Sequence, residues 1–315
     1  MDFQYPLATY LKVYSRCIIK LVGVKLFYMV YIDEKLFEFK KLIEDSIISG
    51  GAKGKESMIR SSVLINLIHD AVKKSFIEAG VNPLNIFPRL GESKPELKMA
   101  GFLKQKDQDI CIVPSNVQKI PTLINWGPLA FENKTDEYGF EFSTNTLVIN
   151  VRSQMSSLAK NSDTLFERTF AEAQNLHMRY PKIVLGEVYL IPVHEYDDEL
   201  VKCNMVGFKN RQTNVEKYIS FFNSINNRNI GDQSYAYERC ALLIVDFNQT
   251  QPYLFRNSDE LKQAGFISKD FEIEYASLNF HNFATDILQI YSNRYNLNNL
   301  IQDHKGSTKN HQEHL

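Results

Sequence analysis

The chain has 315 residues, of which 44% are hydrophobic and 23% charged, and its formal net charge is −1. These values are typical of a globular protein with one large domain or two small ones. They exclude a globally basic nucleic-acid-binding chain, so any DNA-binding surface would have to be a local basic patch. The four cysteines are scattered and form no CxxC pair, which argues against a zinc knuckle and favours reduced thiols in a cytoplasm.

The segment 17–32 is rich in Val, Ile, Tyr and Phe, which favours a β-strand. Lys20 and Lys25 interrupt it, so it lacks the continuous apolar run of about 20 residues that a membrane span needs. No small-residue cleavage site follows it either. Translation from Met29 is an alternative, in which case the chain begins with an amphipathic stretch. We expect residues 1–54 to form an N-terminal extension with a helical segment.

Two helices are predicted next. The first covers residues 33–48 and ends at Gly50-Gly51, because glycine pairs break helices. The second runs from Lys55 to Ala79 with one apolar face at helical spacing, and Gly80 ends it.

The rest of the chain alternates strands and helices. Further elements are predicted in this order: strands at 110–113 and 147–151, a helix at 164–178 capped by Ser162 or Asp163, a strand at 184–193, a helix at 214–223, a strand at 241–247 and a helix at 278–295. This order is typical of an α/β domain over 55–295, with a mixed central β-sheet flanked by helices. The tail 296–315 is polar and is expected to be disordered.

Two carboxylates precede the apolar strand at 110–113. Asp107 and Asp109 alternate along the chain, so they point to the same side if the strand already begins there. A carboxylate beside a buried strand is costly, and a divalent cation is a common reason to keep one there. The alternative interpretation is a solvated turn.

The strand at 147–151 runs into a polar end. Asn150, Arg152 and Gln154 share one face of an extended chain, while Ile149 and Val151 face the other way. A predicted helix follows directly.

This order of elements resembles the PD-(D/E)xK nuclease superfamily, and within it type II restriction endonucleases. The order is a strand that begins after Asp109, a second strand with a polar end, and a helix. The resemblance implies a restriction-endonuclease-like core in the cytoplasm. It also implies Mg²⁺-dependent, site-specific hydrolysis of phosphodiester bonds in double-stranded DNA by a homodimer. Asp109 matches the metal-binding Asp of the family.

The second strand departs from the family pattern because it has no Glu-x-Lys. Gln154 is the candidate for the position of the Lys, and Arg152 for binding the phosphate, since a guanidinium forks onto phosphate oxygens. The missing acid could be Glu96 or Glu172, and less favourably Glu132; Glu167 is expected to be solvated.

The candidate site residues follow from these assignments. The candidate metal ligands are Asp109, Asp107 and Glu96, and the candidate catalytic residues are Asp109, Arg152, Gln154 and Glu172. The absent Glu-x-Lys also supports an alternative, a non-catalytic DNA-binding or defence-complex protein on a decayed nuclease scaffold. A metabolic α/β enzyme would need a cofactor fingerprint, and the sequence shows none.

Overall fold

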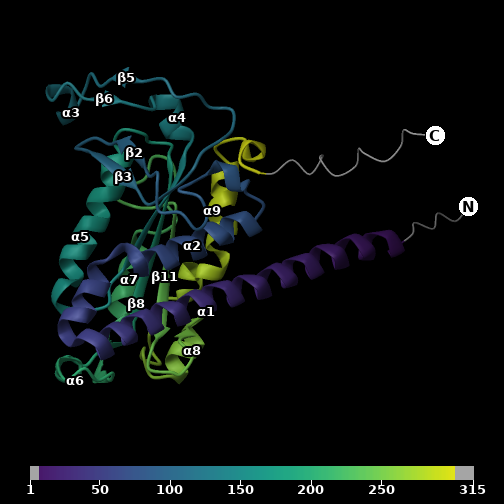
Figure 1. The fold of residues 1–315 in the computed structure, drawn as a ribbon. Helices are drawn as coiled ribbons and strands as arrows, with labels where there is room; N and C mark the ends of the chain where they lie inside the picture. Colours follow the sequence, from purple (N-terminus) through teal and green to yellow (C-terminus); the bar gives the residue numbers. More distant parts are fainter. Residues whose placement is uncertain (1–6, 302–315) are drawn as a thin grey trace, which may run out of the picture.

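The computed structural model describes residues 7–301, with side chains from residue 31 onward, as a mixed β-sheet between two helical layers (Figure 1). The sheet has six strands in the order β1-β4-β7-β8-β11-β12. Their bounds are β1 Ile86–Phe87, β4 Ile110–Ile112, β7 Leu147–Ser153, β8 Val184–Pro192, β11 Arg239–Asp246 and β12 Tyr253–Leu254. The central strands β7, β8 and β11 are parallel, and the other neighbours pair antiparallel. The predicted mixed α/β sheet is confirmed.

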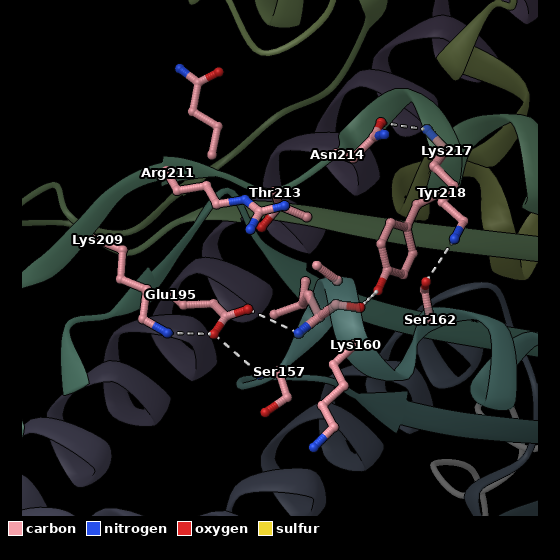
Figure 2. A pocket seen from close by; sticks show the side chains of 13 residues that line it. Ser157, Lys160, Ser162, Glu195, Lys209, Arg211, Thr213, Asn214, Lys217 and Tyr218 are labelled. Atoms are coloured by element: carbon pink, nitrogen blue, oxygen red, sulfur yellow. Dashed lines mark hydrogen bonds and ion pairs between the residues drawn. The ribbon is translucent and has the colours of Figure 1, made fainter.

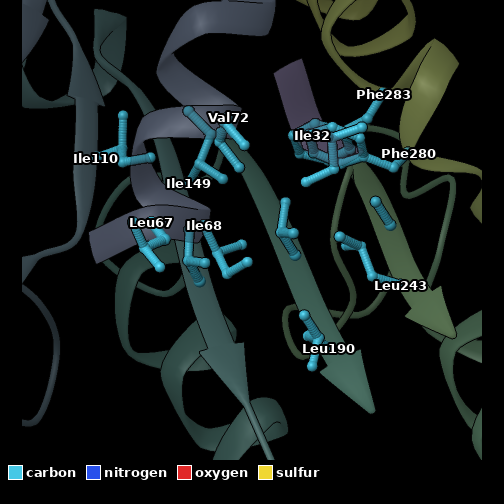
Figure 3. Close-up of a cluster of buried hydrophobic side chains, with 14 of the residues drawn as sticks. Ile32, Leu67, Ile68, Val72, Ile110, Ile149, Leu190, Leu243, Phe280 and Phe283 are labelled. Atoms are coloured by element: carbon cyan, nitrogen blue, oxygen red, sulfur yellow. The ribbon is translucent and has the colours of Figure 1, made fainter. Parts of the chain in front are cut away.

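Five long helices cover the two faces of the sheet. Helices α1 (Leu7–Arg60), α2 (Ser62–Glu78) and α9 (Phe280–Ser292) contribute to a first core, and α5 (Leu158–His177) and α7 (Val215–Ser224) to a second. Alternation along β7 separates the cores: Leu147 and Ile149 lie in the first, and Val148 lies in the second. Figure 3 shows part of the first core, where α2 and α9 pack on the sheet.

Shorter elements surround this frame. Three two-stranded sheets pair β2 (Leu97–Ala100) with β3 (Gln105–Gln108), β5 (Thr122–Leu123) with β6 (Thr135–Asp136), and β9 (His194–Tyr196) with β10 (Phe208–Gln212). The short helices are η1 (Pro83–Asn85), α3 (Pro128–Phe131), α4 (Phe140–Asn145), α6 (Asp198–Lys202), α8 (Ser258–Gln263), η2 (Tyr275–Leu278) and η3 (Leu297–Asn299).

The strand predicted at 17–32 is wrong, because α1 is helical through this segment. β-propensity depends on context, since a strand needs a neighbour with which to exchange hydrogen bonds, and no strand in the described residues pairs here. In the part of the chain that the structure describes, no helix has the length and apolar character to cross a membrane.

The predicted helix boundaries shift where side chains satisfy the free N–H groups of helix ends. α1 has non-helical angles at Gly51 (φ 54°, ψ −136°), as the glycine pair predicts. The single helix expected at 55–79 is instead divided at Ser61, whose hydroxyl accepts a hydrogen bond from Val63 N. α5 begins at Leu158, one turn before the predicted caps Ser162 and Asp163.

The start of the predicted disordered tail is ordered. Residues 297–299 form η3, and Leu300 is fully buried in the first core. Residues 302–315 of that prediction lie outside the described residues.

Helix α9 packs closely on β8 at Gly186. A Cβ added there would lie 2.7 Å from Phe283 Cζ and 2.9 Å from Ile287 Cδ1. We expect Gly186→Ala to lower the free energy of unfolding by about 1–3 kcal/mol through overpacking, measured by urea denaturation. Gly50→Ala is the matched control, because its Cβ would meet nothing within 4 Å, and it should stabilise the helix by about 0.5–1 kcal/mol. Equal effects at the two positions would contradict the packing argument.

Candidate active site

The second core contains a group of polar side chains between the sheet and α5, here called the inner polar cluster. On β7, Asn150 and Arg152 lie on the same face as Val148, which packs in the second core. On β8, Glu187 lies between Leu185 and Tyr189 on the face that also packs in this core. The cluster comprises Lys106, Asp109, Asn150, Arg152, Glu172 and Glu187. These residues come from β3, the start of β4, β7, α5 and β8, so only the folded chain brings them together.

A chain of alternating charges crosses the cluster. Arg152 Nε donates to Glu187 Oε1 at 2.7 Å, and Arg152 Nη2 donates to Glu172 Oε2. Lys106 Nζ lies 2.7 Å from the same oxygen of Glu172. The Glu187 side chain is 0% exposed and that of Arg152 15%, so the chain of charges runs from the protein surface into its interior. An ion pair this deep must be well hydrogen-bonded to offset the loss of hydration.

The two carboxyl groups bound to Arg152 have opposite pKa shifts. Burial raises the pKa of Glu187 above its ordinary value, and the guanidinium of Arg152 only partly opposes this shift. Burial also acts to raise the pKa of Glu172, but the charges of Arg152 and Lys106 outweigh it and hold that pKa below its ordinary value. Glu172 is therefore the permanent counterion of Arg152, whereas Glu187 retains a tendency to bind a proton or a cation.

Two acceptor atoms in the cluster have no hydrogen-bond partner. Asn150 Oδ1 and Glu187 Oε2 are both buried and unpaired, and the two residues are direct Cα partners in the β7–β8 ladder. Neighbouring strands lie about 4.8 Å apart. Unpaired buried acceptors are costly, so we expect the gap between them to be filled. Either a proton on Glu187 donates a hydrogen bond across it, or a cation binds there.

Asp109 continues this line of oxygens onto the next strand. Ile110 pairs with Ile149, which puts Asp109 opposite Asn150, and Asp109 Oδ2 accepts a hydrogen bond from Val151 N at 2.8 Å. We call Asp109, Asn150 and Glu187 the oxygen row. No group of three or more His, Cys, Asp or Glu side chains in the described residues is arranged to hold a metal ion. The row has two carboxylates and one amide, and Mg²⁺ accepts such a sparse set because it keeps several waters.

The other two predicted metal ligands are not members of this row. Asp107 is exposed on β3, opposite Lys98 of β2. Glu96 pairs with Lys94 just before β2. Burial raises the pKa of Cys111, and the charges of Asp109 and Glu96 add to that shift, so Glu96 lies within electrostatic reach of the same thiol as Asp109.

Two further predicted positions also lie outside the cluster. Gln154 is buried, and its Oε1 accepts hydrogen bonds from the hydroxyls of Tyr189 (3.1 Å) and Tyr218 (2.7 Å). This network fixes the turn from β7 into α5. Glu132 is exposed after α3 and pairs with Lys134 at 3.8 Å. Of the predicted catalytic residues, the structure thus brings Asp109, Arg152 and Glu172 together.

Glu187 and His69 were missed by sequence reasoning. The signal for Glu187 is a single acid in the otherwise apolar run Val184–Pro192. His69 has no comparable signal; it lies on α2, its Nε2 is buried without a partner, and burial lowers its pKa although the charge of Asp109 opposes this shift. His69 is therefore a neutral imidazole within electrostatic reach of Asp109.

Comparison with known proteins adds nothing to this assignment, because no protein-family model, curated protein or solved structure matches the chain.

Removing Arg152 should leave Glu187 as an unpaired buried charge. We expect Arg152→Ala to lower the free energy of unfolding by about 3–5 kcal/mol, measured by urea denaturation at neutral pH. The double variant Arg152→Ala/Glu187→Gln should recover a large part of that loss, because it also removes the uncompensated charge. Additive effects of the two substitutions would contradict a direct interaction between these side chains.

The raised pKa of Glu187 predicts a pH-dependent stability. A proton binds the folded state more tightly than the unfolded one, so the stabilisation from neutral Glu187 is present below its ordinary pKa of 4.5 and is lost as pH rises through the folded-state pKa. In EDTA, the unfolding free energy of the parent relative to Glu187→Gln should therefore fall as pH rises from 4.5 toward neutrality. A difference that stays constant over this pH range would contradict the raised pKa.

Proposed function

We propose that this protein is a Mg²⁺-dependent endodeoxyribonuclease that cuts double-stranded DNA at specific sites, as type II restriction endonucleases do. The observation that carries the proposal is the oxygen row, with two unpaired buried acceptors beside a guanidinium. The strand arrangement also fits the resemblance, because β4 and β7 are neighbours and α5 follows β7 and packs on the sheet. Action as a cytoplasmic homodimer belongs to the same proposal.

The oxygen row would hold the cation. Asp109 and Glu187 would supply charge and Asn150 a neutral oxygen, which suits the preference of Mg²⁺ for hard oxygen ligands. When bound, Mg²⁺ polarises the scissile phosphate and lowers the pKa of a bound water. Glu187 in this role replaces the acid that the second strand lacks. A cation there would also favour the ionised carboxylate and displace the proton that burial favours.

Arg152 would stabilise the negative charge that develops on the phosphate. Its Nε and Nη2 groups are bound by Glu187 and Glu172, and this leaves Nη1 to donate to a phosphate oxygen. Glu172 acts here as a positioning residue, because it holds both Arg152 and Lys106. Lys106 adds a second positive charge near the same point.

A non-catalytic DNA-binding or defence-complex protein is the second candidate, and it too has a specific observation in its favour. Arg152 already pairs with Glu172 and Glu187, and a proton shared between Glu187 and Asn150 would satisfy the oxygen row without any metal. The two candidates therefore differ in whether a proton or a cation lies between β7 and β8.

Incubation of the purified protein with plasmid DNA separates these candidates. We expect cleavage with Mg²⁺ and none with EDTA. Asp109→Asn and Glu187→Gln should each slow cleavage at least about 10²-fold, the scale of losing one preorganised catalytic group. Glu167→Gln is the matched control, since Glu167 is exposed on α5.

A second measurement does not depend on activity. Mg²⁺ should raise the melting temperature of the parent but not that of Glu187→Gln, because a ligand that binds only the folded state stabilises it. A parent that neither cleaves DNA nor responds to Mg²⁺ would favour the non-catalytic candidate. Cleavage by Glu187→Gln within tenfold of the parent would remove Glu187 from the metal site.

A further inference from the structure

A second polar site lies beyond the carboxyl ends of β7 and β8, in a cavity of about 430 Å³ (Figure 2). Its walls are the start of α5, strand β10 and the start of α7. Its lining includes Lys160, Glu195, Lys209, Arg211, Lys217 and Tyr218. We call this cavity the basic pocket. Crevices at the carboxyl ends of parallel strands are common ligand sites in α/β folds.

The carboxylate of Glu195, which lines the pocket, already binds groups of the protein itself. Glu195 accepts hydrogen bonds from Ser157 N at 3.1 Å and Leu158 N at 2.9 Å, and Lys209 Nζ lies 3.1 Å away. Figure 2 shows these contacts on one wall of the pocket. Glu195 thus covers the first N–H groups of α5, and Ser157 is held in a left-handed conformation (φ 55°, ψ 36°). The start of α5 is therefore fixed, and its own N–H groups are not the anion site.

Four cations and one carboxylate, that of Glu195, line the pocket. Lys209 and Lys217 pair with Asp198 and Asp163, whose side chains are 57% and 81% exposed. Such exposed ion pairs contribute little free energy, so a ligand can compete with Asp163 for Lys217, whereas Lys209 is also held by the mostly buried Glu195.

The other two cations have no such partner. Lys160 on α5 and Arg211 on β10 line the pocket from different elements, and neither forms an ion pair within the described residues. Unpaired cations on two sides of one small cavity leave it with an excess of positive charge.

We propose that the basic pocket binds a phosphate group, with Arg211 and Lys160 as its principal contacts. A guanidinium forks onto two phosphate oxygens, and a lysine adds a point charge. The volume is within the range of small-molecule sites, so the phosphate can belong to a free nucleotide or to one position of a DNA backbone. The site uses no residue of the oxygen row, and it goes beyond metal-dependent cleavage.

Calorimetric titration of the full-length protein in EDTA tests the pocket, with pyrophosphate as the probe and ionic strength held constant. We expect binding by the parent, and a dissociation constant at least about tenfold higher for Lys160→Ala/Arg211→Ala, because two charged contacts are lost. Both side chains are exposed, so the variant should keep its fold, which circular dichroism checks. Lys41→Ala/Lys269→Ala removes the same charge from exposed positions elsewhere and should bind like the parent.

Two further titrations identify the source of the phosphate. If the source is DNA, the double variant weakens binding of a short duplex and pyrophosphate competes with that duplex. If the source is a free nucleotide, a nucleoside 5′-monophosphate binds the parent and duplex affinity is unchanged in the double variant. The proposal is overturned if pyrophosphate does not bind, or if the two double variants lose affinity equally. Neither result depends on whether the protein cleaves DNA, since EDTA is present throughout.

Discussion

A fully buried carboxyl group at the centre of the sheet is the constraint on which the ion pairs of the inner polar cluster depend. Glu187 lies on β8 between apolar neighbours, where an unpaired charge would be prohibitively costly. Arg152 on β7 offsets that cost and in turn requires Glu172 of α5 as its second partner. Lys106 of β3 then completes the balance of charge. One buried group thereby ties the sheet to its covering helix and to the β2–β3 hairpin.

The same geometry that stabilises this cluster also leaves it incomplete. Asn150 and Glu187 present two acceptors to each other across neighbouring strands, and no protein donor among the described residues reaches either atom. In the low dielectric of a protein interior such a pair has a strong affinity for positive charge. If a proton binds there, the site only stabilises the fold. If a hard cation shared with Asp109 binds there, the site can take part in the proposed hydrolysis. Function therefore depends on which of the two binds more tightly.

One face of one strand connects the two polar sites of the molecule. Asn150 and Arg152 belong to the inner polar cluster, and Gln154, next on the same face, holds Tyr218 of the basic pocket. Both sites therefore lie on the α5 side of the sheet, the inner cluster beneath the helix and the pocket beyond its first turn. A substrate with several phosphates could contact both, while a small phosphorylated ligand would occupy only the pocket.

The sequence alone predicted four strands of the sheet, β4, β7, β8 and β11, and most of its helices, because these strands coincide with apolar runs bounded by polar residues or turn signals. It also indicated Asp109, since a carboxylate beside a buried strand is costly, and Arg152, through the family resemblance. Tertiary structure decided everything that depends on a partner distant in sequence. Within residues 7–301 the segment 17–32 has no neighbouring strand and is helical, and Glu195 supplies the cap that moves the start of α5.

The role of Gln154 likewise followed from its tyrosine partners, and that of Glu187 from the register of β8 against β7. Local propensity fixes which face of a strand a side chain takes, but strand order and register fix which charges share that face. The sequence therefore suggested Asp109, Arg152 and Glu172, and only the folded chain showed that Glu187 joins them.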